Sequence, residues 1–224
     1  MRSVIFDLDG TLVDTSGDLI AAANTCFAQM QAPNLLDPVR DAGTALRGGR
    51  AMLELGLSRL GRTYDQAAID AYYPVLLDAY RQAIDVHTVL YPGAMEAVET
   101  LKLNGYKVAI CTNKPFALAK DLLRQLGVLD AFGALVGADT LPVRKPDPEH
   151  LLEAARRAGG DPALCCLVGD TITDRATAQA ANVPSILVTF GPAGGDMAAL
   201  EPEGLLQDFA DLPAMVLDLI GSKE

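Results

Sequence analysis

Short apolar runs alternate with helix-patterned segments along most of this chain, and this alternation restricts the possible folds more than any other feature. Runs of strand length without strict polar alternation occupy residues 3–8, 106–111, 134–138, 164–169 and 184–190. Helical patterns occupy residues 95–105, 119–127, 147–160 and 174–183, with another at 207–220. Strands and helices in this order form a parallel sheet covered by helices. We therefore expect an α/β protein with a Rossmann-like parallel core.

One long segment interrupts this alternation. Between Asp14 and about Asp85 the sequence shows helical patterns and no convincing strand. A connection of roughly 70 residues is too long for an ordinary crossover between strands. We expect a small helical domain at residues 15–86, inserted into a core made of residues 1–14 and 87–224.

Charge and hydropathy exclude several classes of partner. The 224 residues carry a formal net charge of −11, which repels nucleic acid and anionic membranes, so an anionic substrate needs a local positive site. No apolar run approaches the roughly 18 residues of a membrane-spanning helix. The N-terminus MRSVIFDLDG lacks the pattern of a secretory signal. We expect a cytoplasmic protein with no membrane or nucleic-acid partner.

Cysteine and histidine usage argues against a zinc site. The four cysteines form no CxxC pair, and adjacent residues on a strand point to opposite faces, so Cys165 and Cys166 cannot share one ion. Buried free thiols in a reducing compartment are the better interpretation. The chain has only two histidines, so any metal should be a hard ion bound by oxygen.

Two acidic clusters follow predicted strands. DLDGTLVDT (7–15) places Asp7 and Asp9 after the first strand, and GDTITD (169–174) places Asp170 and Asp174 after a later one. Open α/β sheets bind ligands at the carboxyl ends of their strands. Carboxylates that converge there repel one another, and a bound Mg²⁺ relieves that repulsion because it takes oxygen ligands. The pattern therefore predicts a Mg²⁺ site.

Two further polar segments also follow strands. CTNKP (111–115) offers the Thr112 hydroxyl and Asn113 near a helix start, an arrangement that binds anions. VRKPDPEHL (143–151) places Lys145 where it can neutralise a carboxylate and a phosphate oxygen. Each segment alone is typical of an ordinary loop or helix start. Together with the acidic clusters they supply the groups needed for phosphoryl transfer through an aspartyl-phosphate.

These motifs also resemble those of a known family. DLDGTLVDT, CTNKP, KPDPEHL and GDTITD resemble the four motifs of the haloacid dehalogenase (HAD) superfamily, and the helical insert resembles its cap domain. Within the superfamily, most of the chain is similar to the phosphoglycolate phosphatases. Thr171 and Asn182 stand where that group commonly has serine and glycine, and residues 189–195 differ more. The resemblance implies a HAD-like core with a cap, and a Mg²⁺-dependent phosphatase acting on a small phosphomonoester, first of all 2-phosphoglycolate.

The resemblance also implies roles for individual residues. Asp7 is the nucleophile that attacks phosphorus, and Asp9 is the general acid and then the general base. The expected Mg²⁺ ligands are the Asp7 carboxylate, the Asp9 carbonyl and Asp170, with Asp174 orienting metal-bound waters. The groups expected on the transferring phosphoryl group are Thr112 and Lys145, with contacts from Gly10 and Asn113.

The segment ALRGGRAML (45–53) resembles the cap loop that recognises substrates in these phosphatases. Arg47 and Arg50 are therefore candidates to bind a substrate carboxylate, because a guanidinium matches the geometry of that group. Lys114 and Arg144 are weaker candidates that we expect to be exposed in loops. His150 should lie at the surface of its helix or at the helix end.

Several alternatives remain open from the sequence. A related phosphatase could act on pyrophosphate, a sugar phosphate or a nucleotide. A phosphomutase similar to β-phosphoglucomutase would pass the phosphoryl group to a sugar hydroxyl instead of water. A phosphate-binding protein without activity is disfavoured, because it would have no need for both Asp7 and Asp9. We expect the protein to be a monomer or a homodimer.

Overall fold

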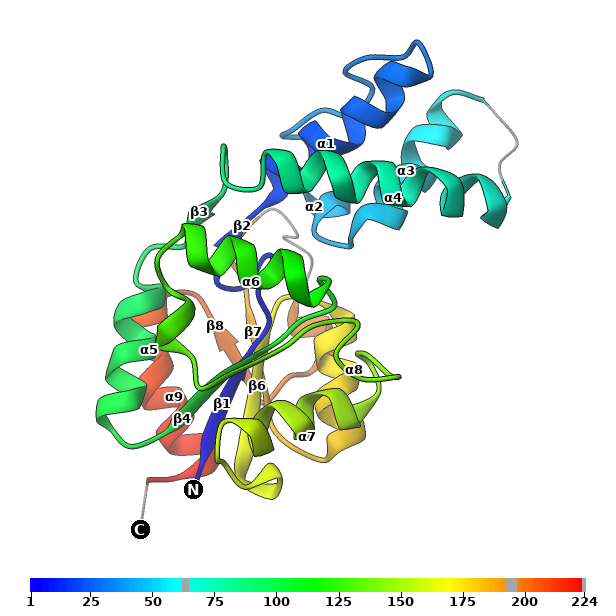
Figure 1. Cartoon of the computed structure of the whole chain (residues 1–224). Helices are drawn as coiled ribbons and strands as arrows, with labels where there is room; N and C mark the ends of the chain where they lie inside the picture. Colours follow the sequence, from blue (N-terminus) through cyan, green and yellow to red (C-terminus); the bar gives the residue numbers. More distant parts are fainter. Residues whose placement is uncertain (62–64, 192–196, 223–224) are drawn as a thin grey trace. The chain divides into compact units, whose positions relative to one another are not determined.

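A parallel sheet forms the centre of the larger part of the chain (Figure 1). The computed structural model describes residues 1–61, 65–191 and 197–222, and within them this sheet has six strands in the order β5-β4-β1-β6-β7-β8. The strands are β1 (Ser3–Phe6), β4 (Lys107–Cys111), β5 (Ala134–Val136), β6 (Cys165–Gly169), β7 (Ser185–Val188) and β8 (Gly204–Leu206). All five expected strands are present, which confirms the α/β prediction, and β8 is an addition.

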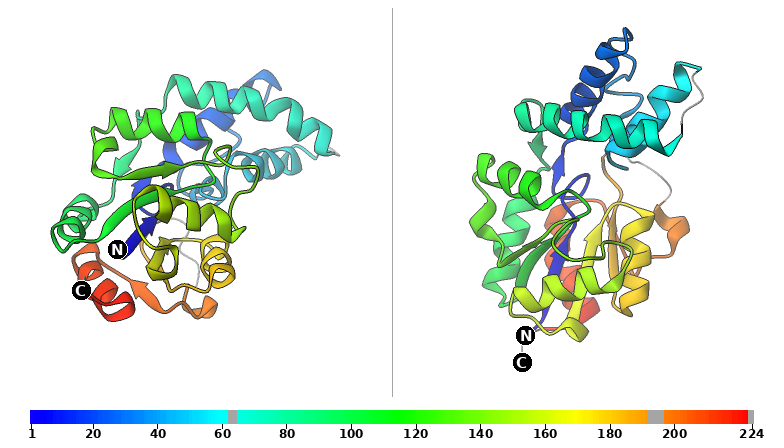
Figure 2. Two further views of the ribbon diagram at one scale, coloured as in Figure 1. Left: turned by 60° about the horizontal axis from the view of Figure 1, so that its bottom comes forward. Right: turned by 45° about the vertical axis from the view of Figure 1, so that its right-hand side comes forward.

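Helices cover both faces of this sheet (Figures 1 and 2). They are α5 (Ala94–Leu103), α6 (Phe116–Gln125), α7 (Pro148–Arg157), α8 (Ile172–Ala181) and α9 (Leu212–Ile220). Helices α7 and α8 pack side by side on one face, and α5 and α9 pack on the other. Short 3₁₀ turns span Leu129–Ala131, Pro162–Leu164, Met197–Leu200 and Phe209–Asp211.

The sheet is buried on both faces, which explains why its strands lack polar alternation. Every residue of β1, β6 and β7 is buried. Ile5, Ala109 and Leu167 pack with Leu151 and Ala154 in one cluster beneath α7. The four cysteines are free and buried, as predicted. Among the described residues, no helix is long and apolar enough to cross a bilayer.

Strand register brings three loops to one edge of the sheet. Phe6, the last residue of β1, lies opposite Ile110 of β4 and Val168 of β6. The residues that follow these strands therefore lie at the same carboxyl edge.

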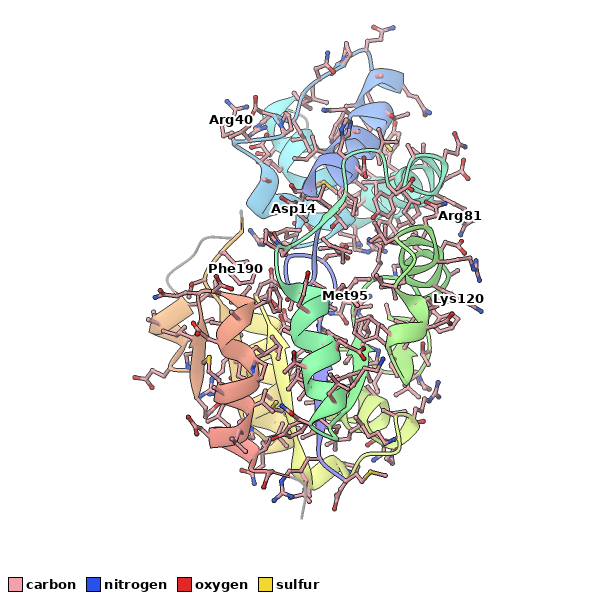
Figure 3. The ribbon with its side chains drawn as sticks, turned by 90° about the vertical axis from the view of Figure 1, so that its left-hand side faces the viewer. Asp14, Arg40, Arg81, Met95, Lys120 and Phe190 are labelled. Atoms are coloured by element: carbon pink, nitrogen blue, oxygen red, sulfur yellow. The ribbon has the colours of Figure 1, made fainter. Side chains whose placement is uncertain are left out.

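Phe190, beyond β7, packs between Tyr91 and Phe209 with ring centroids 5.0 and 5.3 Å away (Figure 3). Of the divergent stretch 189–195, residues 192–195 lie outside the described residues.

The chain divides into two compact units, Met1–Val13 with Leu90–Glu224 and the segment Asp14–Val89. Two short strands, β2 (Val13–Asp14) and β3 (Val89–Leu90), pair where the chain passes from one unit to the other. The smaller unit contains the helices α1 (Ser16–Gln29), α2 (Ala42–Ala45), α3 (Gly49–Arg59) and α4 (Gln66–Gln82). The described residues from 15 to 61 and from 65 to 86 contain no strand.

Two contacts hold this helical unit together. A Cβ on Gly56 of α3 would lie 2.0 Å from the Phe27 ring of α1, so glycine permits the close packing of these helices. Asp18, buried in the first turn of α1, accepts hydrogen bonds from the backbone N–H groups of His87 and Thr88, each at 2.9 Å. The Asp18 carboxylate therefore fixes the end of the unit to its beginning.

Candidate active site

Three buried carboxylates meet at the carboxyl edge of the sheet. Asp7 follows β1, and its backbone N–H donates to the Val168 carbonyl of β6 at 2.9 Å. Asp170 and Asp174 follow β6, the strand next to β1. One oxygen from each of the three carboxylates lies within 4.8 Å of the other two. The structure thus brings Asp7 together with two acidic residues that lie more than 160 positions later in the sequence.

Burial and mutual repulsion perturb the carboxyl groups of Asp7 and Asp170. The pKa of Asp7 is raised to about 6, chiefly by burial and also by the charge on Asp174, against the opposing effect of Lys145. Burial, followed by the charges on Asp174 and Asp7, raises the pKa of Asp170 well above its ordinary value. Buried groups of one sign held this close together favour a bound cation.

Lys145 lies inside this acidic cluster. Its Nζ is 2.6 Å from Asp174 Oδ1 and 3.0 Å from Asp7 Oδ1, and its side chain is buried. Burial lowers the pKa of Lys145, but the charges on Asp174 and Asp7 outweigh it and raise the pKa overall. The residue therefore stays an ammonium ion beside Asp7, where a phosphoryl group bound to that carboxylate would need positive charge.

The acidic cluster has the donor set of a hard cation site. Thr11 Oγ1 donates to Asp170 Oδ1 at 2.8 Å, whereas the buried Asp170 Oδ2 has no hydrogen-bond partner among the described residues. An orphaned buried carboxylate oxygen is costly unless a cation binds it. Because one oxygen from each of the three carboxylates lies within 4.8 Å of the other two, the cluster fits Mg²⁺, which takes oxygen ligands. Thr11 was not predicted, although it lies two residues after Asp9 within the motif DLDGTLVDT, which is the signal that could have found it.

Asp174 serves both the site and its helix. Its Oδ2 accepts from the backbone N–H of Thr171 at 3.1 Å and from the Thr171 hydroxyl at 2.5 Å. The Thr171 hydroxyl accepts from the Asp174 N–H in turn, which completes a capping box at the start of α8. A Cβ on Gly169 would lie 2.4 Å from Asp174 Cγ, so glycine is required there. The motif GDTITD is thus a helix cap as well as a source of site carboxylates.

Asp9 lies apart from these three carboxylates and pairs with Lys114. The Lys114 Nζ is 2.9 Å from Asp9 Oδ1 and 3.2 Å from Asp9 Oδ2. The Lys114 side chain is only 4% exposed, so the expectation of an exposed loop lysine was wrong. Gly10, with φ of +84°, turns the chain after Asp9, and its N–H donates to Val13 O at 2.8 Å. The only sequence signal for Lys114 was its position two residues after Thr112.

Thr112 and Asn113 organise the loop after β4. The Thr112 N–H donates to Val136 O at 2.9 Å, and the buried Thr112 hydroxyl accepts from the Lys114 N–H at 3.2 Å. Asn113 Nδ2 donates to the Lys145 carbonyl at 3.0 Å. The segment CTNKP therefore anchors both lysines of the site.

His150 is buried, so the expectation of a surface or capping position was wrong. Its Nε2 lies 3.0 Å from the Gly137 carbonyl and its Nδ1 lies 3.2 Å from Cys111 Sγ. The carbonyl can only accept, which assigns the proton to Nε2 and leaves Nδ1 to accept from the thiol. Burial lowers the pKa of His150, which favours this neutral form. The residue packs α7 against β4 and takes no part in the acidic cluster.

The arginines expected to bind substrate have different environments. Arg50 is partly exposed and pairs with residues of its own helical unit, with its NH1 2.6 Å from Asp70 Oδ1 and its guanidinium 4.7 Å from the Tyr73 ring centroid. Arg47 is exposed, and its guanidinium makes no hydrogen bond or ion pair within the part of the chain that the structure describes. Arg144 is exposed, as expected.

Comparison with known proteins shows which family this chain resembles. Residues 1–182 match the family model of hydrolases described as haloacid dehalogenase-like hydrolase. The phosphoglycolate phosphatase of Mesorhizobium japonicum is 39% identical over 209 residues, which cover 92% of this chain and 90% of that protein. The phosphoglycolate phosphatase of Agrobacterium fabrum is 38% identical over 98% of this chain and 94% of its own length.

Solved structures share the fold. A predicted phosphoglycolate phosphatase from Haemophilus somnus superposes with a TM-score of 0.84 at 24% identity, covering 96% of this chain and 97% of that one. A hydrolase from Pseudomonas syringae superposes with a TM-score of 0.73 at 27% identity, covering 99% and 100%. The family model spans most of the sequence, and two relatives are 38% and 39% identical to the chain over more than 90% of its length. The chain therefore belongs to the haloacid dehalogenase-like hydrolase family.

Proposed function

We propose that the protein is a Mg²⁺-dependent phosphatase that hydrolyses 2-phosphoglycolate to glycolate and phosphate. The observation that carries the proposal is the position of Asp7, which lies 3.0 Å from the Lys145 ammonium and is grouped with the carboxylates of Asp170 and Asp174. The family supplies the class of reaction, and the names of the relatives supply the substrate.

In this mechanism Asp7 is the nucleophile. Its Oδ1 accepts from the Leu8 N–H at 2.7 Å and lies 3.0 Å from Lys145 Nζ, so the carboxylate is fixed before substrate arrives. Attack by the carboxylate forms an oxygen–phosphorus bond, breaks the bond from phosphorus to the ester oxygen, and leaves an aspartyl-phosphate. Lys145 and the Thr112 hydroxyl hold the phosphoryl oxygens, with Gly10 and Asn113 shaping the loops around them.

The metal would be held by the carboxylates of Asp7 and Asp170 and by the Asp9 carbonyl. Asp174 would orient the waters bound to the metal. When bound, Mg²⁺ supplies positive charge that offsets the repulsion between the anionic nucleophile and the phosphate. The chain's own contribution is the orientation of these oxygens, which Thr11 and the α8 capping box provide.

Asp9 moves the protons. As a general acid it gives a proton to the ester oxygen of the departing glycolate. As a general base it then takes a proton from the water that attacks the aspartyl-phosphate, which releases phosphate and restores Asp7. The ion pair between Asp9 and Lys114 supports this division of roles, because it gives Asp9 a partner outside the group formed by Asp7, Asp170 and Asp174.

We further propose that residues 15–86 act as a cap that contributes to substrate binding. Arg47 is the better candidate of its two arginines, because Arg50 is already held by Asp70 and Tyr73. Four free, buried cysteines support a reducing compartment, and we place the protein in the cytoplasm as a monomer or homodimer.

Phosphate release across a panel of phosphorylated metabolites tests the proposal. With Mg²⁺ present we expect the highest kcat/KM for 2-phosphoglycolate, and loss of activity on addition of EDTA. Asp7→Asn should lower kcat by about 10³-fold or more, since the neutral amide is a far weaker nucleophile than the carboxylate. Asp121→Asn, on the exposed surface of α6, is the matched control and should retain full activity.

Two outcomes would contradict this proposal. Equal, low rates on every compound would reject 2-phosphoglycolate as the substrate while keeping the chemistry. Full activity in Asp7→Asn would reject the covalent mechanism.

A further inference from the structure

Lys114 is a buried cation that the phosphatase chemistry described above does not use. We propose that Lys114 binds the carboxylate of the substrate and so selects phosphomonoesters that carry a carboxylate next to the ester carbon. This inference rests on the proposed function, because it identifies the group that recognises the acid half of that substrate.

The fold holds the Lys114 ammonium at a defined position. Its backbone N–H donates to Thr112 Oγ1 at 3.2 Å, and its carbonyl accepts from the Ala138 N–H at 2.9 Å. The side chain is 4% exposed and ends 2.9 Å from Asp9 Oδ1. A lysine anchored at its backbone and at its ammonium group is well placed to bind a ligand, since little side-chain freedom is left to lose.

Asp9 connects this position to the substrate. To protonate the leaving group, the Asp9 carboxyl must come within hydrogen-bond distance of the ester oxygen. In 2-phosphoglycolate the carboxylate carbon is two bonds of about 1.5 Å from that oxygen. Lys114 already touches the same Asp9 carboxyl. The substrate carboxylate therefore falls within reach of the ammonium, whose three N–H donors can serve more than one acceptor.

Charge balance supports the same assignment. The site holds the carboxylates of Asp7, Asp9, Asp170 and Asp174, and its two lysines are divided between them. Lys145 pairs with Asp7 and Asp174 on the nucleophile's side, whereas Lys114 pairs with Asp9 on the leaving group's side. A substrate carboxylate brought into this acidic surrounding needs a cation to offset the loss of its hydration.

The test compares two substrates with similar leaving groups. Both 2-phosphoglycolate and ethyl phosphate release an alkoxide, but only the first carries a carboxylate. We expect Lys114→Met and Lys114→Gln to lower the ratio of their kcat/KM values by at least about 30-fold, through loss of a charge-assisted hydrogen bond. Lys114→Gln serves as the second variant because its amide can still donate to Asp9.

Two controls identify the source of any change. Lys120→Met removes a lysine from the outer side of α6, where it lies over the Phe116 ring, and should leave the ratio unchanged (Figure 3). Arg47→Gln removes the other candidate for the carboxylate.

The outcomes separate this inference from the proposed function. An equal loss on both substrates would overturn it, because Lys114 would then act on every phosphomonoester through Asp9. A ratio that falls in Arg47→Gln and not in the Lys114 variants would also overturn it. A wild-type enzyme that turns over phosphomonoesters without preferring the carboxylate would instead reject the proposed substrate.

Discussion

One hydroxyl group, on Thr11, determines how the Asp170 carboxylate faces the acidic cluster. It donates to Oδ1 at 2.8 Å and leaves the buried Oδ2 for a cation. Thr11→Val keeps the shape of the side chain and removes the donor. We expect the Mg²⁺ concentration for half-maximal activity to rise by about 10- to 100-fold, as for other outer partners of metal ligands. Calorimetric titration with Mg²⁺ would measure the same change in binding.

Thr100→Val is the matched control for this substitution. The Thr100 hydroxyl donates to Glu96 O within α5 and has no contact with the acidic cluster. Its Mg²⁺ dependence should equal that of the wild type. If Thr11→Val also kept the wild-type Mg²⁺ dependence, the hydroxyl would have no part in orienting Asp170.

Individual site residues differ in how far sequence could identify them. Asp7, Thr112 and Asp170 each come at or just after the end of a buried strand, and the order of parallel strands brings such positions to one edge. The burial of Lys114 could not be predicted, because it depends on the turn at Gly10 that brings Asp9 to the loop after β4. Patterns along one strand do not encode a contact between two loops.

At the scale of elements, the attachment of α8 to the sheet depends on a buried arginine that follows Asp174 directly. Arg175 NH1 is 2.7 Å from Glu203 Oε2 and 3.0 Å from Ser185 Oγ, and its Nε donates to Leu200 O at 3.1 Å. These contacts attach α8 to the sheet edge formed by β7 and β8. We expect Arg175→Met to lower the free energy of unfolding by about 1–3 kcal/mol, because its partners lose a charged donor.

Urea unfolding of Arg175→Met and of a surface control would check this value. Arg157 on α7 pairs with Glu153, but its side chain is 42% exposed. Arg157→Met should therefore change the free energy of unfolding by less than about 1 kcal/mol. Equal stabilities for the two variants would show that the contacts of Arg175 add nothing beyond an ordinary surface pair.

The elements also show where pattern reading succeeds. Strands buried on both faces and helices that end at Gly105, Gly127 and Gly159 were predictable, and all three glycines have positive φ. Strand β8 was not predictable, since its three residues gain their conformation from pairing with β7 rather than from their own sequence. The burial of His150 likewise depends on partners on two other segments, Cys111 and Gly137.

For the whole molecule, the acidic cluster makes stability depend on both pH and metal. Without a cation, the folded-state pKa of Asp7 is about 6 against an ordinary 3.8, and burial with repulsion also raises the pKa of Asp170. The folded state then binds more protons than the unfolded state between these values. The contribution of these groups to stability is therefore present below about pH 4 and is lost as pH rises through about 6.

His150 has the opposite dependence, so a single pH profile would mix the two effects. Its lowered pKa means that stability is lost as pH falls below the ordinary value of 6.5. The difference in melting temperature with and without Mg²⁺ isolates the cluster, since the contribution of His150 is common to both samples. The cation must displace protons from Asp7 and Asp170 at low pH. We expect Mg²⁺ to stabilise the protein strongly at pH 7.5 and weakly at pH 5.

The size of this effect follows from mass action. A Mg²⁺ concentration 100 times the dissociation constant adds about 2.7 kcal/mol to the free energy of unfolding. Asp170→Asn should remove most of the shift at pH 7.5, because the buried Oδ2 loses its charge. Equal shifts at both pH values, or an unchanged shift in Asp170→Asn, would place the stabilising cation elsewhere on this strongly acidic chain. A pH-dependent shift that Asp170→Asn abolishes would tie metal binding, charge repulsion and folding to the same carboxylates.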